Sequence, residues 1–169
     1  GFFAMPAALP AAGKAMQWLA QEMDRRLTAA ERKDVVVVGA GFSGMYQLYK
    51  LREQGLDVQV FEAGSDVGGT WYWNRYPGAR VDIESMAYSF SFSEELQQEW
   101  EWSEKYSPQP ELLKYAQHIA DRFDLKNHIA FNTRVATAHF DEDADEWLVT
   151  TECGRRIRAQ HLVMATGVL

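Results

Sequence analysis

Apolar residues repeat with different periods along the chain, and these periods divide it into an extension and one larger domain. After Pro10 they recur at three- and four-residue steps, at Met16, Leu19, Met23, Leu27 and Ala30. With charged residues between them, this spacing predicts an amphipathic helix, whose apolar face packs against a neighbouring domain or, alternatively, binds a partner. We therefore interpret residues 1–32 as an N-terminal extension and residues 33–169 as a single domain.

The larger domain begins with a strand, a helix and a second strand. Val35–Val38 form a run of β-branched residues followed at once by glycine, which is typical of a strand buried on both faces of a parallel sheet. Helical spacing returns over residues 42–54 and ends at Gly55, and Val58–Glu62 predict a second strand. The three elements fit within about 30 residues, the length of a βαβ unit.

The rest of the domain predicts a long loop, two helices and several short strands. Residues 63–92 lack a long periodic segment, and helices are expected at 93–101 and 110–123. Short strands between polar turns are expected at 129–131, 135–140, 146–152 and 156–158. A last buried strand is expected at 161–165. The expected fold is α/β: a Rossmann-like domain with a parallel sheet plus a small antiparallel β-meander formed by the short strands.

Composition narrows the class of ligand. The chain has 17 Lys and Arg against 24 Asp and Glu, a formal net charge of -7, whereas nucleic acids and anionic membranes need clustered positive charge. No apolar run approaches the about 20 residues of a transmembrane helix. The single cysteine, Cys153, can form no intrachain disulfide, which favours a reducing compartment. We expect a soluble, cytoplasmic protein that binds neither nucleic acid nor membrane.

A glycine motif follows the valine strand and opens the first predicted helix of the domain. Residues 39–44, Gly-Ala-Gly-Phe-Ser-Gly, match GxGxxG, and the flanking strand and helix make the match specific. The first glycine would make the tight turn, the second would let backbone approach a pyrophosphate, and the third would permit contact between helix and strand. The exposed N–H groups and the helix dipole favour the pyrophosphate charge. We predict cofactor contacts at Gly39, Gly41, Phe42, Ser43 and Gly44.

An acidic residue ends the second strand. Glu62 lies about 20 residues beyond the glycines, where a carboxylate accepts hydrogen bonds from the ribose hydroxyls of an adenosine. A carboxylate also repels a ribose 2′-phosphate, so FAD or NAD suits this site better than NADP. The glycines and Glu62 together predict a dinucleotide site.

The segment from Gly68 to Asp82 combines glycines, aromatic rings and charge in the sequence GGTWYWNRYPGARVD. Adjacent glycines let the backbone pass close to a cofactor. The aromatic side chains would form a flat apolar wall that shields a flavin ring from water. Arg80 and Asp82 place charge beside this wall.

This segment and its surroundings resemble class B flavoprotein monooxygenases of the Baeyer–Villiger type. The resemblance rests on the run GGTWYWNRYPGAR from Gly68, on DIES from Asp82 and on YSFS from Tyr88. It is close to the phenylacetone and steroid monooxygenase types. It covers residues 33–169 and implies the N-terminal, FAD-binding portion of such an enzyme.

The resemblance implies a role for several residues on the two sides of FAD. Ser43 and Glu62 would hold the ADP part, and the backbone of Val135 would meet the adenine end. The flavin side would be lined by Gly69, the second of the two adjacent glycines, and by the residues after it, which are Thr70, Trp71, Tyr72 and Trp73.

Further residues would face the flavin and the second cofactor. The resemblance places Asp82 and Tyr88 at the flavin, and it directs Arg80, Val81 and Asp82 toward NADPH. Asp82 would be the catalytic residue, because in the family this acid orients an arginine that stabilises a peroxyflavin. The alternative for Asp82 is an ordinary N-cap or surface carboxylate.

The resemblance also implies a reaction. Enzymes of this type use NADPH to reduce FAD, add dioxygen to form a C4a-peroxyflavin, and convert a ketone into an ester or lactone. The implied cofactors are FAD and NADPH, and the implied substrates are a ketone and dioxygen. Two alternatives stay open: a flavin monooxygenase that oxidises nitrogen or sulfur, against which the WYWNRYPG run argues, and a non-catalytic FAD-binding or assembly module.

The family pattern extends beyond Leu169. The family's second GxGxxG, its His- and Trp-containing fingerprint and its catalytic arginine would all come later in the chain. We therefore expect the fold to be incomplete and the chain to be catalytically inactive alone. The remainder of the enzyme, or a complementing chain, would complete the fold.

Other conspicuous residues carry no site. The histidines lack metal-ligand spacing, so no metal site is predicted; they are His118, His128, His139 and His161. Trp100 and Trp102 are interpreted as packing or interface residues. An acidic cluster is interpreted as a solvated face; it comprises Glu94, Glu95, Glu99, Glu101 and Glu104.

Overall fold

A computed structural model describes residues 13–18 and 31–167 of the chain. Residues 13–18 are helical, and Met16 and Trp18 are exposed there. The remaining positions of the predicted amphipathic helix lie outside the described residues; they are Leu19, Met23, Leu27 and Ala30.

The domain is built on one six-stranded sheet whose order is β3-β2-β1-β6-β5-β4. The strands are β1 (Arg32–Val38), β2 (Val58–Phe61), β3 (Ile129–Ala130), β4 (Val135–Asp141), β5 (Glu146–Thr151) and β6 (Arg156–Met164). β3 with β2, β2 with β1 and β1 with β6 are parallel pairs. β6 with β5 and β5 with β4 are antiparallel pairs. The predicted α/β class, with a parallel sheet and an antiparallel meander, is confirmed.

Two details of the predicted meander were wrong. The strand at Ile129 pairs parallel to β2, through Val60 and Ile129, so it belongs to the parallel part. The segments expected at 156–158 and 161–165 are one strand, β6, which pairs with β5 only over Arg156–Ala159 and with β1 along nearly its whole length. The end of its pairing with β5 after Ala159 falls where the sequence had suggested a break between two strands.

Helices connect and cover the parallel strands. They are α2 (Phe42–Glu53), α3 (Thr70–Trp73), α4 (Glu94–Glu99) and α5 (Gln109–Arg122), with short 3-10 turns η1 (Ser85–Tyr88) and η2 (Lys126–His128). α4 begins after Ser93, whose hydroxyl accepts a hydrogen bond from the Leu96 N–H at 3.2 Å, as an N-cap does. The helices expected at 42–54, 93–101 and 110–123 are confirmed within one or two residues.

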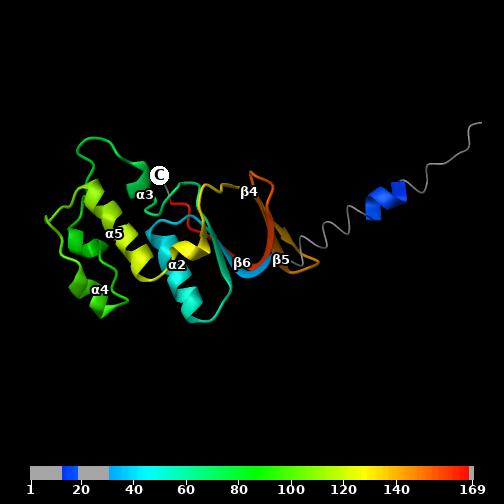
Figure 1. Ribbon diagram of the computed structural model, residues 1–169, viewed down its shortest axis with the longest axis horizontal. Helices are drawn as coiled ribbons and strands as arrows, with labels where there is room; N and C mark the ends of the chain where they lie inside the picture. The colour runs from blue at the N-terminus through cyan, green and yellow to red at the C-terminus, as the bar shows by residue number, and fades with distance from the viewer. Residues whose placement is uncertain (1–12, 19–30, 168–169) are drawn as a thin grey trace, which may run out of the picture.

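The valines of β1 are buried on both faces of the sheet. Val35 and Val37 belong to a core cluster with residues of α2 and α5, such as Leu48 and Ile119. Val36 belongs to a second cluster on the opposite face, which the meander strands complete. Figure 1 shows α2 and α5 to one side, with the β4–β6 part of the sheet curling away from them. The parallel strands are thereby fixed from both sides, and the glycine-rich and acidic turns lie at their carboxyl ends.

Candidate functional site

The carboxyl end of β1 turns sharply into α2. Gly39 has a φ of +102°, and a Cβ there would lie 2.5 Å from the carbonyl oxygen of Ala165 at the end of β6. A Cβ on Gly44 would collide with the carbonyl of Gly39. These contacts confirm the predicted reasons for the first and third glycines: only glycine lets this turn and this helix approach each other so closely.

The N-terminus of α2 leaves its backbone donors available. The first N–H groups of a helix have no partner within it, and no side chain caps this end, where the N-cap is Gly41. Ser43 is exposed in the first turn, and Phe42 is half-buried behind it. The turn therefore presents backbone N–H groups and the positive end of a helix dipole, which favour an anion.

The second glycine makes a contact that the motif did not predict. A Cβ on Gly41 would lie 3.3 Å from the Cα of Gly69, and one on Gly69 would lie 2.8 Å from the Cα of Gly41. The Gly68 N–H also donates to the Ala40 carbonyl at 3.1 Å. The glycine turn after β1 and the double glycine before α3 thus touch backbone to backbone.

Glu62 ties the glycine turn to the end of β2. Its carboxylate accepts hydrogen bonds from the Ala40 N–H at 2.6 Å and from the Gly64 N–H at 2.7 Å, and its side chain is buried, with 5 % of the residue exposed. A carboxylate offers about four lone-pair sites, so acceptor capacity remains beside the turn. Sequence reasoning placed Glu62 at the glycine turn but missed both backbone partners, because neither is visible from spacing.

Val135 lies close to the Glu62 turn although β4 and β2 are far apart in the strand order. The Thr133 N–H donates to the Glu62 carbonyl and the Asn132 N–H to the Gly64 carbonyl, both at 2.8 Å. Val135 packs on the apolar cluster that includes Phe61. The start of β4 is therefore brought to the same end of the sheet as Glu62.

The aromatic residues of α3 have three different surroundings. Trp71 is buried against Val81 and Leu112. Tyr72 lies over Gly64, and its hydroxyl is 2.8 Å from the Ser65 hydroxyl. Trp73 is 56 % exposed and meets the Tyr72 ring edge-on at 86°. The three rings do not form one flat wall, since Trp71 contributes to the core; Thr70 at the helix start is exposed.

The charged residues after α3 lie on an exposed loop with a buried anchor. Val81 is buried, and its N–H donates to the Ser107 carbonyl at 3.2 Å. Arg80 donates to the Glu104 carboxylate at 3.2 Å and to the Tyr106 carbonyl at 3.1 Å. The Asp82 carboxylate is exposed and has no hydrogen bond or ion pair to another described residue. The N-cap of η1 is Glu84, so Asp82 is not an N-cap, and of the two alternatives for it only the surface carboxylate fits the structure.

Tyr88 lies next to these groups. Its ring meets Trp71 edge-on at 5.7 Å and Phe42 at 6.0 Å. Burial, and to a lesser extent the negative charge of Asp82, raise the pKa of the Tyr88 hydroxyl above its ordinary value. Phe42 at the start of α2, Trp71 in α3 and Tyr88 therefore form a continuous aromatic contact beside Asp82.

Sequence reasoning missed several buried polar residues that hold this region together. Gln109, at the first position of α5, donates through Nε2 to the Trp71 carbonyl. Ser85 and Ser107 lie 2.9 Å apart through their hydroxyls and are buried. No motif signals them, because a buried polar side chain shows itself only once its partners are folded around it.

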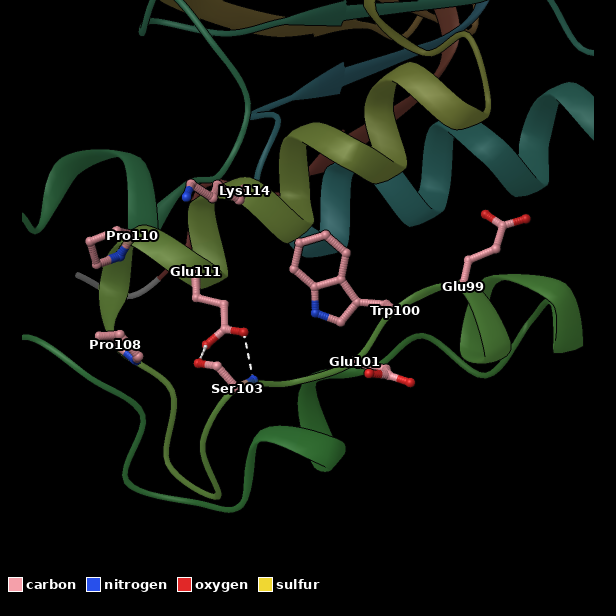
Figure 2. A pocket seen from close by; sticks show the side chains of 8 residues that line it. All are labelled: Glu99, Trp100, Glu101, Ser103, Pro108, Pro110, Glu111 and Lys114. Carbon is pink, nitrogen blue, oxygen red and sulfur yellow. Dashed lines mark hydrogen bonds between the residues drawn. The ribbon is translucent and has the colours of Figure 1, made fainter.

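Two hollows in the surface lie apart from the glycine turn. The larger, of about 510 Å³, is lined by residues from the start of α5 and from the segment after α4, and Figure 2 shows Glu111 hydrogen-bonded to Ser103 within it. The second, of about 480 Å³, borders Trp100 and Trp102. Neither is lined by a residue predicted to bind cofactor. Trp100 and Trp102 both pack on Tyr115, at ring distances of 5.1 and 4.9 Å.

The remaining predictions concern metal ligands, membrane spans, the acidic cluster and the cysteine, and each can be compared with the described residues. That part of the chain contains no group of three or more metal-binding side chains and no helix long and apolar enough to cross a bilayer. The acidic residues from Glu94 to Glu104 are exposed, as expected of a solvated face. Cys153 is exposed and unpaired by disulfide.

The chain is similar in sequence to a known domain family and to several monooxygenases. Residues 37–101 match the family model of an NAD(P)-binding Rossmann-like domain. A Baeyer–Villiger monooxygenase from Pseudooceanicola batsensis is 47% identical over 80% of this chain and 25% of its own length. A phenazine N-monooxygenase from Lysobacter antibioticus is 48% identical over 80% of this chain and 25% of its own length.

Solved structures agree with these relatives. An oxidized steroid monooxygenase bound to NADP is 58% identical, with a TM-score of 0.79, over 80% of this chain and 26% of that one. A structure of OTEMO in complex with FAD and NADP is 46% identical, with a TM-score of 0.78, over 81% of this chain and 26% of that one. The chain thus spans about a quarter of the length of the relatives it matches.

Proposed function

Because this chain is homologous to Baeyer–Villiger monooxygenases over four-fifths of its length, we propose that it binds FAD and forms the FAD-binding portion of such an enzyme. The whole protein would use NADPH and dioxygen to oxidise a ketone to an ester or lactone. The observation that carries the proposal is the pairing of the α2 N-terminus with the buried carboxylate of Glu62.

The residues present fit the ADP half of FAD. The uncapped first turn of α2 supplies N–H donors to a pyrophosphate, and the Ser43 hydroxyl is exposed beside them. Glu62 is held at the same turn by the Ala40 N–H, with acceptor sites left for ribose hydroxyls. A carboxylate in this place disfavours the 2′-phosphate of NADP, so the site suits FAD.

The flavin half would lie over the segment from Gly69 to Tyr88. In this proposal Gly69 and Thr70 bring backbone close to the ring system, while Tyr72, Trp73 and Tyr88 exclude water from it and the buried Trp71 contacts the Tyr88 ring. When bound, FAD supplies the redox chemistry. The chain's part is to fix the orientation of the ring and the electrostatics around it, and the backbone of Val135 would meet the adenine at the other end.

Asp82 is the residue we propose to act closest to the reaction. Its carboxylate is exposed and without a charged partner among the described residues, so it can hold a cation supplied from elsewhere in the whole protein. A fixed arginine would stabilise negative charge developing beside the flavin. Arg80, Val81 and Asp82 would face NADPH, which we propose is bound mainly by other parts of the enzyme.

A second candidate is N-oxidation. The phenazine N-monooxygenase is as similar to this chain as the Baeyer–Villiger enzyme is, at 48% against 47% identity. Similarity over this portion therefore does not by itself separate oxidation of a ketone from oxidation of a nitrogen. We also propose a cytoplasmic location, since a chain with one cysteine suits a reducing compartment.

A two-step experiment tests the proposal. The purified chain is mixed with FAD, desalted and examined by visible absorbance, which should retain a flavin spectrum. The whole protein containing this portion is then supplied with NADPH and either a ketone or an aromatic N-heterocycle, and the products are identified by mass spectrometry. An ester or lactone supports the leading proposal, an N-oxide supports the second, and a desalted chain without flavin contradicts both.

A further inference from the structure

We propose that Ser85, Ser107 and Gln109 are positioning residues that fix the Asp82 loop and α3 relative to each other. Ser107 and Gln109 lie at the entry to α5, and each reaches a different part of the flavin side. The inference rests on the proposed function only in the statement that Asp82 and α3 face a flavin. The restraint itself is a property of the folded chain.

The Asp82 loop is held at both ends by the segment before α5. The Val81 N–H donates to the Ser107 carbonyl at 3.2 Å, and the Ser85 N–H donates to the Lys105 carbonyl at 2.8 Å. Between these two anchors, residues 82–84 are all exposed. The loop can therefore move only as far as its anchors allow, and the position of the Asp82 carboxylate depends on them.

A buried pair of hydroxyl groups strengthens the second anchor. Ser85 is 1 % exposed and Ser107 is 0 % exposed, and their Oγ atoms are 2.9 Å apart. The Ser85 Oγ accepts from the Ser107 N–H at 2.8 Å and has the carbonyls of Glu104 and Lys105 within 2.9 and 3.0 Å as acceptors. Removing a buried partner leaves a donor unsatisfied, which costs more than the bond itself contributes. The pair therefore favours a single arrangement of the two segments.

Gln109 holds α3 from the same helix end. Its side chain donates to the carbonyl of Trp71, and its backbone N–H donates to the Ala79 carbonyl at 2.9 Å. Gln109 is 7 % exposed, so water does not compete for these bonds. Leu112, one turn further along α5, packs between Trp71 and Val81. One rigid helix end therefore sets the distance between the two groups that the proposed function directs at the flavin.

The roles of the three residues can be separated by substitution. Ser85→Ala removes the acceptor of the Ser107 N–H and should loosen the Asp82 loop. Gln109→Glu keeps the size of the side chain but removes its donor, and should loosen α3. Ser103→Ala is the matched control, because it also removes a serine hydroxyl bonded to a neighbour, Glu111, but on the exposed side of α5.

Hydrogen exchange on the chain without cofactor is the first readout. We expect Ser85→Ala to speed exchange at the hydrogen-bonded amides of Val81 and Ser85, and Gln109→Glu in residues 71–74, by about five-fold or more from the loss of one buried bond, with the control unchanged. Exchange in α2 should stay at the wild-type rate, which identifies a local effect. Unchanged exchange in both segments, or equal changes in the control, would overturn the inference. Should Ser85→Ala not fold, Ser107→Ala, which keeps the Ser107 N–H bond to Ser85, replaces it in the same measurement.

The visible circular dichroism of bound flavin is the second readout, and it would not change if the three residues contributed only to stability. With FAD, both variants should keep a Kd within about two-fold of wild type, because the ADP half is bound elsewhere, while the visible circular dichroism of the flavin changes. An unchanged spectrum in both variants contradicts the inference. If wild type binds no FAD but the exchange pattern is as expected, the proposed function fails and the positioning role stands.

Discussion

At the scale of single residues, the site depends on Glu62, whose carboxylate is hydrogen-bonded within the fold as well as being available to a ligand. Glu62 accepts from Ala40 and Gly64 in the chain itself. A motif-based interpretation assigns such a residue to ribose alone. Its backbone bonds show that it also fixes the turn to which the nucleotide would bind, so substitutions at Glu62 affect both stability and affinity.

The Glu62→Gln variant separates this residue from an ordinary surface acid. Glutamine has one acceptor oxygen where two N–H donors need one each, so a buried donor is left facing the amide nitrogen. We expect a loss of about 1–3 kcal/mol in unfolding free energy and weaker FAD binding by at least about ten-fold. Urea unfolding and FAD titration measure the two effects. Glu142→Gln, in the exposed β4–β5 turn, is the control, and equal behaviour of the two variants would refute the role.

Ionisation of Tyr88 reports on the neighbouring Asp82. The pKa of the tyrosine is raised by burial and then by the Asp82 charge, so the folded state holds its proton more tightly than the unfolded state does. The resulting stability is present below the ordinary tyrosine pKa of about 10 and is lost as the pH rises through the higher folded value. Asp82→Asn should lower the Tyr88 pKa, measured by ultraviolet absorbance of tyrosinate. An unaltered titration would show that Asp82 does not face Tyr88.

At the scale of elements, backbone contacts between loops position the site. α2 begins at a turn whose glycines touch β6 and α3, and α5 begins where two loops are anchored. The strand, helix and strand around the glycine motif could be predicted because their signals are local: a valine run, a 3.6-residue period and a stop glycine. The strand at 129–131 was predicted as well, but its parallel pairing with β2 and the continuity of β6 past the end of its pairing with β5 could not be, since both are set by long-range pairing.

Gly44→Ala tests the contact between α2 and the β1 turn. Alanine normally stabilises a helix over glycine by about 1 kcal/mol, but here its Cβ would collide with the Gly39 carbonyl. We expect destabilisation instead, by roughly 1–3 kcal/mol as for overpacked sites, measured by thermal unfolding. Gly13→Ala is the control, because that glycine is helical and a Cβ there would meet nothing within 4 Å. Stabilisation by Gly44→Ala would show that the helix does not approach the turn this closely.

At the scale of the whole molecule, the sheet brings separate sequence segments to one end. The turns after β1 and β2, the loop after β3 and the end of β6 meet there, through Gly39, Glu62, Thr133 and Ala165. Sequence reasoning identified the nucleotide-binding turn and the α/β class. It did not identify that Trp71 is a core residue or that Gln109 and the serine pair organise the flavin side, because burial of those residues follows from tertiary packing alone.

The most direct test of the central claim is calorimetric titration of the chain with FAD, ADP and FMN. Because the site at the α2 N-terminus is built for a diphosphate and an adenosine ribose, FAD and ADP should both bind, ADP should compete with FAD, and FMN, which lacks the adenylate, should bind far more weakly. Binding of FMN as tight as that of FAD, or no binding of either FAD or ADP, would contradict the account.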